Sequence, residues 1–407
     1  MDALVTTMRA MRGRLVAHLA RSLGLAQLAL AEDAVQIAAL RALEVWPAQG
    51  VPANPAGWLY RTARHAAIDR LRAEAKHESL PDDDGAPPEF GRPAAPQRFG
   101  GELDDDELAL LFALCRPEIP LPTQVALALR ALGGLELEAI ADGLLTTPAA
   151  LAQRLTRART LLRDAELGLP AGPELADRRE AVLSALLLMF NAGWQGRGED
   201  PRAVCWEAIR LARAVAAHPW AAHADADALA ASLLFHGARL TGRLDAQGDI
   251  VPLPGQPRDR WDMGLVRMGF VHLQRAQRAT RLSRFHLQAG IAAEHATAPD
   301  YARTDWPRIL GYYEALVELD PSTAPRLGHA IALAEAGSPR AACNLLEALH
   351  TQAPAPLRAH TLAALAHAHA RLGEMPAARA RLAEAIVCAP SDADRRLLQR
   401  RAEALRG

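Results

Sequence analysis

The sequence is poor in aromatic residues, lysine and cysteine, and the scarcity of cysteine argues against some kinds of functional site. Aromatic residues make up 4% of the 407 residues, and Lys76 is the single lysine among many arginines. The four cysteines are far apart and form neither a CxxC pair nor a Cys/His cluster at zinc-binding spacing. We therefore expect no metal site and no cofactor. We expect all four cysteines to be buried, reduced side chains: Cys115, Cys205, Cys343 and Cys388.

Long apolar runs and targeting signals are also missing. The longest strongly apolar stretch, from Ala181 to Phe190, is far too short to span a bilayer, which needs about 20 residues. The N-terminal stretch MDALVTTMRAMRGRL has arginines but neither a continuous apolar core nor a cleavage signal. These absences predict a cytoplasmic protein without a membrane partner.

Catalytic motifs are absent as well. The chain has no Gly-rich phosphate loop, nucleophile elbow or HExxH motif, so we expect no catalytic residues and no enzyme activity. Two groups of histidines lie close together in sequence, but scattered histidines on alanine-rich helices are more often surface or packing residues than metal ligands. The groups are His286 with Glu294 and His295, and His360 with His367 and His369.

Alanine and leucine at helical spacing are abundant, and strand-like alternation is not seen. The pattern predicts an all-α protein. We expect helices from 14 to 20, from 28 to 46, from 55 to 76, and four more between 104 and 163. Pro47 and the turn-rich stretch QGVPANP stop the second of these helices. Ten further helices are expected between 181 and 389, among them 201–217, 306–319 and 339–350.

The stretch from Leu135 to Arg163 predicts two short helices joined by a turn. Leu151, Leu155 and Leu162 form part of an apolar stripe on the second helix, which begins with Thr147 as N-cap. A short helix, a tight turn and a second helix without acidic residues are typical of a helix-turn-helix. An ordinary helical hairpin with a solvated arginine face is the alternative. The polar positions of the second helix are Gln153, Arg154, Arg157, Arg159 and Arg163.

A second cationic helix is expected from Pro55, with Asn54 as its N-cap. A helix that mixes aromatic and cationic side chains suits a DNA strand, whose bases stack and whose phosphates need neutralising. The alternative is a packed helix with a solvated face, and we expect Trp58 to be a half-buried packing residue. The cations are Arg61, Arg64, His65, Arg70, Arg72 and Lys76.

The stretches LAEDAVQIAALRALEVW and NPAGWLYRTARHAAIDRLR resemble region 2 of bacterial sigma factors of the extracytoplasmic-function (ECF) group. The resemblance implies that Asp33 and Gln36 bind the β′ clamp helices of core RNA polymerase. It also implies that Arg61, Arg64, His65, Arg70 and Arg72 face the promoter −10 element, with Asp69 orienting neighbouring arginines. The family generally has a glutamate and an aromatic residue where this chain has Ile37 and Ala38.

Most of the segment from 105 to 165 resembles sigma region 4, whose last helix enters the major groove of the −35 element. The resemblance implies contact with the polymerase β flap and with promoter DNA. Arg side chains there can pair bidentately with guanine edges. On this basis Gln153, Arg154 and Arg157 contact DNA bases, and Arg159 and Arg163 contact phosphates. The two matches occur in the order expected for a sigma factor.

The segment beyond about Pro170 resembles the long C-terminal extension of one ECF subgroup, in which a helical domain precedes repeats like tetratricopeptide (TPR) units. A weak repeat near the end places Gly337 over Gly373 and Leu346 over Leu382, close to the 34-residue TPR period. Such repeats imply an unknown protein or ligand as a further partner.

The expected organisation has five parts. A region 2-like domain (1–76) is followed by an acidic, Pro/Gly-rich linker (77–101), a region 4-like domain (102–167), a helical domain (168–300) and TPR-like repeats (301–407). The predicted function is promoter-specific transcription initiation with core RNA polymerase, regulated by the extension. The alternatives are a stand-alone helix-turn-helix regulator and a TPR-type scaffold with degenerate sigma domains.

Overall fold

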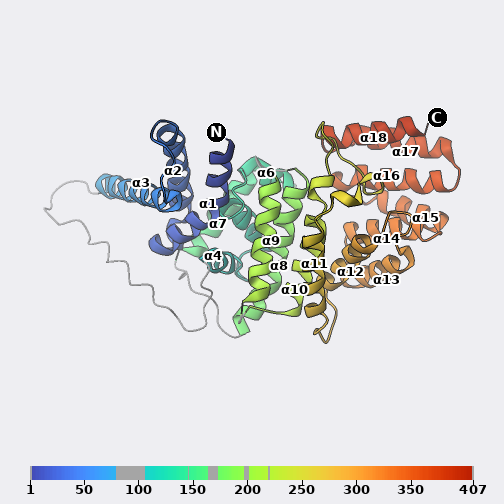
Figure 1. Ribbon diagram of the computed structural model, residues 1–407, viewed down its shortest axis with the longest axis horizontal. Helices are drawn as coiled ribbons and strands as arrows, with labels where there is room; N and C mark the ends of the chain where they lie inside the picture. The colour runs from blue at the N-terminus through green and yellow to red at the C-terminus, as the bar shows by residue number, and fades with distance from the viewer. Residues whose placement is uncertain are drawn as a thin grey trace. The chain divides into compact units, whose positions relative to one another are not determined.

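The structure is a computed structural model that describes residues 2–78, 106–144, 146–163, 173–196, 201–218 and 221–405. The described residues are all-α as expected, with one isolated bridge between Leu244 and Ile250 in place of a sheet. The expected linker lies outside them, apart from residues 77 and 78. The chain divides into two compact units, Met1–Ala222 and His223–Gly407, each described by itself below (Figure 1).

The first unit begins with three helices that contact one another: α1 (Asp2–Leu23), α2 (Leu28–Gln49) and α3 (Pro55–Glu78). Asn54 caps α3, since its Oδ1 accepts a hydrogen bond of 2.9 Å from the backbone N–H of Gly57. The second helix was expected to stop at Pro47 and the turn-rich QGVPANP stretch. It runs three residues past the expected end at Trp46 and ends at Gln49, the first residue of that stretch. Pro47 lies in the last turn of α2, where little helix remains to be disturbed, and Gly50 follows as the C-cap with a φ of 82°.

Four helices follow: α4 (Asp106–Leu114), α5 (Leu121–Ala131), α6 (Leu137–Gly143) and α7 (Pro148–Leu162). The hairpin of α6 and α7 forms as predicted. Thr147 caps α7, with its hydroxyl accepting from the N–H of Ala150 at 3.2 Å. The predicted stripe of α7 is buried, namely Leu151, Leu155, Ala158 and Leu162.

Two further helices belong to the same unit, α8 (Pro173–Trp194) and α9 (Pro201–Ala217). Both contact α4, and α8 also contacts α5. Arg178 of α8 is buried and donates a hydrogen bond of 3.1 Å to the carbonyl oxygen of Phe112. Arg210 of α9 forms an ion pair with the buried Glu107 of α4. The region 4-like module is therefore packed against the first helices of the extension.

The second unit is a succession of helices in which each contacts the next. Gly337 and Gly373 both adopt positive φ, 100° and 77°, at the turns that precede two of these helices. Leu346 and Leu382 are both buried, so the repeat seen in the sequence has equivalent positions in the structure. The helices are α10 (Ala224–Gly237), α11 (Met263–Ala276), α12 (Arg284–Thr297), α13 (Trp306–Leu319), α14 (Thr323–Glu335), α15 (Pro339–His350), α16 (Ala355–Arg371), α17 (Met375–Val387) and α18 (Asp392–Ala404).

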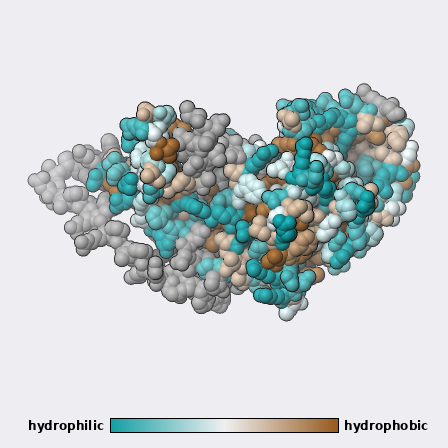
Figure 2. Space-filling view, viewed as in Figure 1, coloured by the Kyte–Doolittle hydropathy of each residue, from teal (hydrophilic) through white to brown (hydrophobic). Residues whose placement is uncertain are grey.

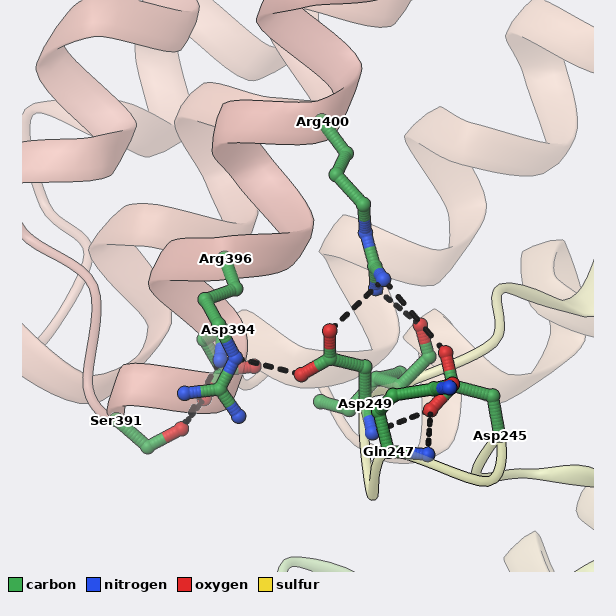
Figure 3. A network of polar contacts seen from close by, with 8 residues as sticks. Asp245, Gln247, Asp249, Ser391, Asp394, Arg396 and Arg400 are labelled. Carbon is green, nitrogen blue, oxygen red and sulfur yellow. Dashed lines mark hydrogen bonds and ion pairs between the residues drawn. The ribbon is translucent and has the colours of Figure 1, made fainter.

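Helix α18 was not expected from the sequence. It packs on the preceding helices through Leu398 and Ala402 and also makes charged contacts. Figure 3 shows Arg396 and Arg400 of α18 reaching the carboxylate of Asp249, at 2.5 and 3.0 Å. Asp249 lies in the loop between α10 and α11, where Asp245 accepts hydrogen bonds from the backbone. These contacts join the last helix of the unit to a loop near its beginning.

Candidate polymerase and nucleic-acid interface

The outer face of α2 combines acidic, polar and apolar side chains. The two predicted polymerase contacts, Asp33 and Gln36, are exposed on it. Ile37 and Leu40 follow at helical spacing, and Leu40 is 56% exposed although it is a large apolar residue. An exposed apolar ridge with polar neighbours is typical of a protein-binding surface. That Ile37 and Leu40 belong to this surface was not predicted from the sequence. Their spacing from Asp33 and Gln36 along the helix could have indicated it.

The predicted DNA contacts of α3 fall into two groups. Arg61, Arg64, His65 and Arg72 are exposed, and their spacing places them along one side of the helix. Their inner neighbours Leu59, Ala63 and Ala67 are buried, so this side faces away from the core. The structure thus gives α3 a cationic stripe of four side chains.

Arg70 lies on a different side of α3 from this stripe. The Arg70 guanidinium is 3.4 Å from the carboxylate of Glu74 and 3.8 Å from that of Asp33. Arg70, a predicted DNA contact, is therefore paired with Asp33, a predicted polymerase contact. Among the described residues Asp69 has no ion pair with an arginine, so its predicted orienting role is not seen. Trp58 is half-buried as expected, edge-on to Trp46 with ring centroids 5.3 Å apart.

The predicted DNA contacts of α7 also fall into two groups, exposed and partly buried. Gln153, Arg154 and Arg157 are exposed on one side of the helix, and Arg163 is exposed just after its end. Arg159 is partly buried on the opposite side, where its Nη2 atom is 2.8 Å from the Oε2 atom of Glu32. The structure therefore brings together the three predicted base contacts and separates Arg159 from them.

Glu32 is the centre of a buried ionic cluster that joins α2 to α5 and α7. Its side chain is 4% exposed, and the Nε atom of Arg130 lies 3.3 Å from the same carboxylate oxygen that Arg159 contacts. Arg12 of α1 adds a hydrogen bond of 2.9 Å to the carbonyl oxygen of Arg130. Burial raises the pKa of the Glu32 carboxyl, although the charges of Arg159 and Arg130 lower it. The cluster was not predicted.

A second contact joins α1 to the start of α4. The Nδ1 atom of His18 lies 2.6 Å from the carboxylate of Asp106, and Arg21 binds the same carboxylate. This hydrogen bond raises the pKa of His18. Burial alone would raise the pKa of Asp106, but its bonds with His18 and Arg21 outweigh burial and lower it. In the structure the region 2-like and region 4-like helices are thus held together at two places.

The histidines considered as metal ligands have other contacts. His286 forms a capping box with Ser283 at the start of α12, and His295 lies edge-on to Trp306. His367 lies 2.7 Å from Glu335, and is thus engaged within the repeats. No group of three His, Cys, Asp or Glu side chains able to hold a metal ion occurs within the described residues.

The cysteines are free thiols. Cys115, Cys205 and Cys343 are buried as expected, and burial raises the pKa of Cys115 to about 12. The expectation is wrong for Cys388, which is partly exposed because it lies at the end of α17. No described helix is long and apolar enough to cross a membrane.

Comparison with known proteins places these surfaces in a family. The model of Sigma-70 region 2 matches residues 9–77, which hold the exposed face of α2 and the cationic stripe of α3. The chain therefore carries a sigma-70 region 2 domain at its N-terminus. A family of unknown function, DUF6596, matches residues 178–277, from α8 to the end of α11.

One relative resembles most of the chain. Uncharacterized protein R00370 of Rhizobium meliloti (strain 1021) is 36% identical over 330 residues, which cover 79% of this chain and 77% of the relative. No solved structure matches the chain. The chain belongs to the family of ECF-like sigma factors with a C-terminal extension, as the resemblance implied.

Proposed function

We propose that this chain is a non-catalytic initiation factor that binds core RNA polymerase and directs it to a two-part promoter. The observation that carries the proposal is the pair of exposed surfaces within the region 2 match, the polar and apolar face of α2 and the cationic stripe of α3. Helix α2 binds the β′ clamp helices through Asp33 and Gln36, with Ile37 and Leu40 adding apolar contact.

The two cationic helices divide the promoter between them. The stripe of α3 neutralises phosphates at the −10 element, where the strands separate. On α7, Arg154 and Arg157 pair with base edges of the −35 element, while Arg163 holds a phosphate. The module that carries α7 also contacts the β flap. This division requires the two modules to separate, because the Glu32 cluster holds α7 against α2 in the structure.

Run-off transcription on genomic promoter fragments tests the proposal. Core polymerase with the chain should give discrete transcripts, and Arg154→Ala with Arg157→Ala should reduce them, since each base contact contributes about 1–3 kcal/mol. Arg213→Ala on α9, another exposed arginine, is the matched control. Promoter binding without core polymerase would instead indicate a stand-alone regulator. Unchanged transcription in the double variant would favour a scaffold with degenerate sigma domains.

The extension regulates initiation in this proposal, through its repeats and an unidentified partner. A truncation that tests this role should end after Ala222, because α8 and α9 belong to the first compact unit. Promoter activity equal to that of the full chain would exclude a regulatory role for the second unit.

A further inference from the structure

Helix α11 is fixed to the second unit by its inner face. Val266, Gly269 and His272 are buried there, and the helix contacts α10 and α12. A Cβ atom at Gly269 would lie 2.7 Å from the ring of Phe235, so α11 approaches α10 closely at this point. His272 lies 2.7 Å from the carboxylate of Asp227 on α10. These contacts fix the rotation of α11 about its axis, so its opposite face points away from α10 and α12.

That opposite face carries large apolar side chains. Met263, Phe270 and Val271 lie at i, i+7 and i+8, on one side of the helix, and are 50%, 37% and 48% exposed. Phe270 is held in place by an edge-on contact with Phe235, with ring centroids 4.9 Å apart. An exposed aromatic ring that is already fixed loses little conformational entropy on binding a partner.

Arginines are frequent on α11 and in the loop that follows it. Between Met263 and Arg284 the sequence has five arginines and no acidic residue. Four of them, at positions 267, 275, 278 and 281, are exposed and have no ion pair with any described residue. Arg267 lies one turn after Met263, and Arg275 lies one turn after Val271. Ion pairs within the described part of the chain therefore do not neutralise the positive charge of Arg267 and Arg275 on α11, or of Arg278 and Arg281 in the loop after it.

The composition of the face favours a protein partner over a nucleic acid. Phenylalanine, methionine and arginine are enriched in protein–protein interfaces, whereas DNA interfaces are more polar. Figure 2 shows hydrophobic atoms beside hydrophilic ones over the region that Figure 1 labels α11. Single exposed apolar residues are common on protein surfaces, but three that share one helix face form a patch.

We propose that this face of α11 is a docking surface for an acidic, partly apolar surface of core RNA polymerase. The inference rests on the proposed function, which supplies the partner protein, and adds a contact outside the sigma-70 region 2 match. Phe270 and Val271 supply the apolar contact, and the arginines supply charge complementarity and faster association.

A binding titration with purified core polymerase tests the proposal. The full-length chain carries a fluorescent label at its N-terminus, and its anisotropy is followed at low and at moderate salt. The double variant Arg267→Glu with Arg278→Glu should weaken binding by about tenfold at low salt, and by less at moderate salt. The control is Arg213→Glu with Arg358→Glu, which makes the same charge change at two exposed arginines without ion pairs to described residues.

A second variant tests the apolar contact without changing charge. Met263→Ser with Val271→Ser should weaken binding by about tenfold at both salt concentrations, because it removes only apolar contact. Both residues are half exposed, so their loss should leave the fold intact, and thermal unfolding followed by circular dichroism verifies this.

The possible results separate the two proposals. If the wild-type chain binds core polymerase and both variants bind equally well, the docking surface is excluded while the proposed function stands. If the wild-type chain does not bind core polymerase, the proposed function fails, and the docking proposal with it. A labelled promoter duplex without polymerase forms a second arm. Loss of duplex binding in the charge variant, with unchanged polymerase binding, would assign the face to DNA and overturn the proposal.

Discussion

Arg159 and Arg154 lie five residues apart on one helix and have different surroundings. Both were predicted to contact promoter DNA, since the sequence shows the same cationic side chain at polar positions of α7. Arg154 is exposed, whereas Arg159 is paired with the buried Glu32. The partner that distinguishes them is 127 residues away in the sequence, and no local pattern indicates it.

Replacing Arg159 by alanine should lower the free energy of unfolding by about 2 kcal/mol. The substitution removes one of the charged partners of a buried carboxylate. Urea unfolding of the full-length chain measures the change. Arg154→Ala is the matched control and should change stability by less than about 0.5 kcal/mol. Equal effects of the two substitutions would contradict the ionic cluster.

His18 makes the contact between α1 and α4 depend on pH. Its pKa is raised in the folded protein, so the stability that it contributes is fully present below its unfolded value near 6.5. That contribution is lost as the pH rises through the raised pKa. The difference in urea midpoint between the wild-type chain and His18→Gln should therefore be largest near pH 5.5 and smaller at pH 8.5. A difference that stays constant with pH would show that folding does not raise the pKa of His18.

At the scale of elements, helix periodicity predicted most of the fold. The expected ranges for α9, α13 and α15 coincide with the structure, since each has a clear apolar stripe between a proline or tryptophan and a turn. Helix α18 was missed because Leu398 is its one buried residue. Its ion pairs are with Asp249, far away in sequence, and such charge contacts leave no periodic signal.

The ionic contacts of α18 give a prediction for hydrogen exchange. Asp249→Asn removes the charge that Arg396 and Arg400 share, so the backbone amides of α18 should exchange faster, by about fivefold or more. Asp392→Asn removes an exposed pair with Arg395 within the helix and serves as the control. Protection of α18 that is equal in both variants would show that apolar packing alone holds it.

At the scale of the whole chain, the sequence predicted the sigma-like organisation but not how its parts pack. The order of the two cationic modules can be read from motifs, because each motif is local. Their packing in the first unit depends on Glu32, Glu107 and Asp106, three carboxylates whose partners come from other modules. The division after Ala222 coincides with none of the expected domain boundaries.

Binding of core polymerase should separate the two modules. Spin labels at Ala73→Cys on α3 and Leu161→Cys on α7, with Cys388→Ser, report the distance between exposed positions of the two helices. In the free chain we expect one dominant short distance, and with core polymerase a longer one. An unchanged distance in a complex that is active in transcription would show that separation is not needed.

The Glu32 cluster also affects the concentration of core polymerase at which half of the protein is bound. If the closed form is about a hundredfold more populated than the separated form, half-saturation requires about a hundredfold more polymerase than the separated form alone would need. A substitution at Glu32 that favours separation then lowers that concentration without altering any side chain on the outer face of α2. One interior carboxylate would in this way determine the share of polymerase that this protein captures in competition with other factors.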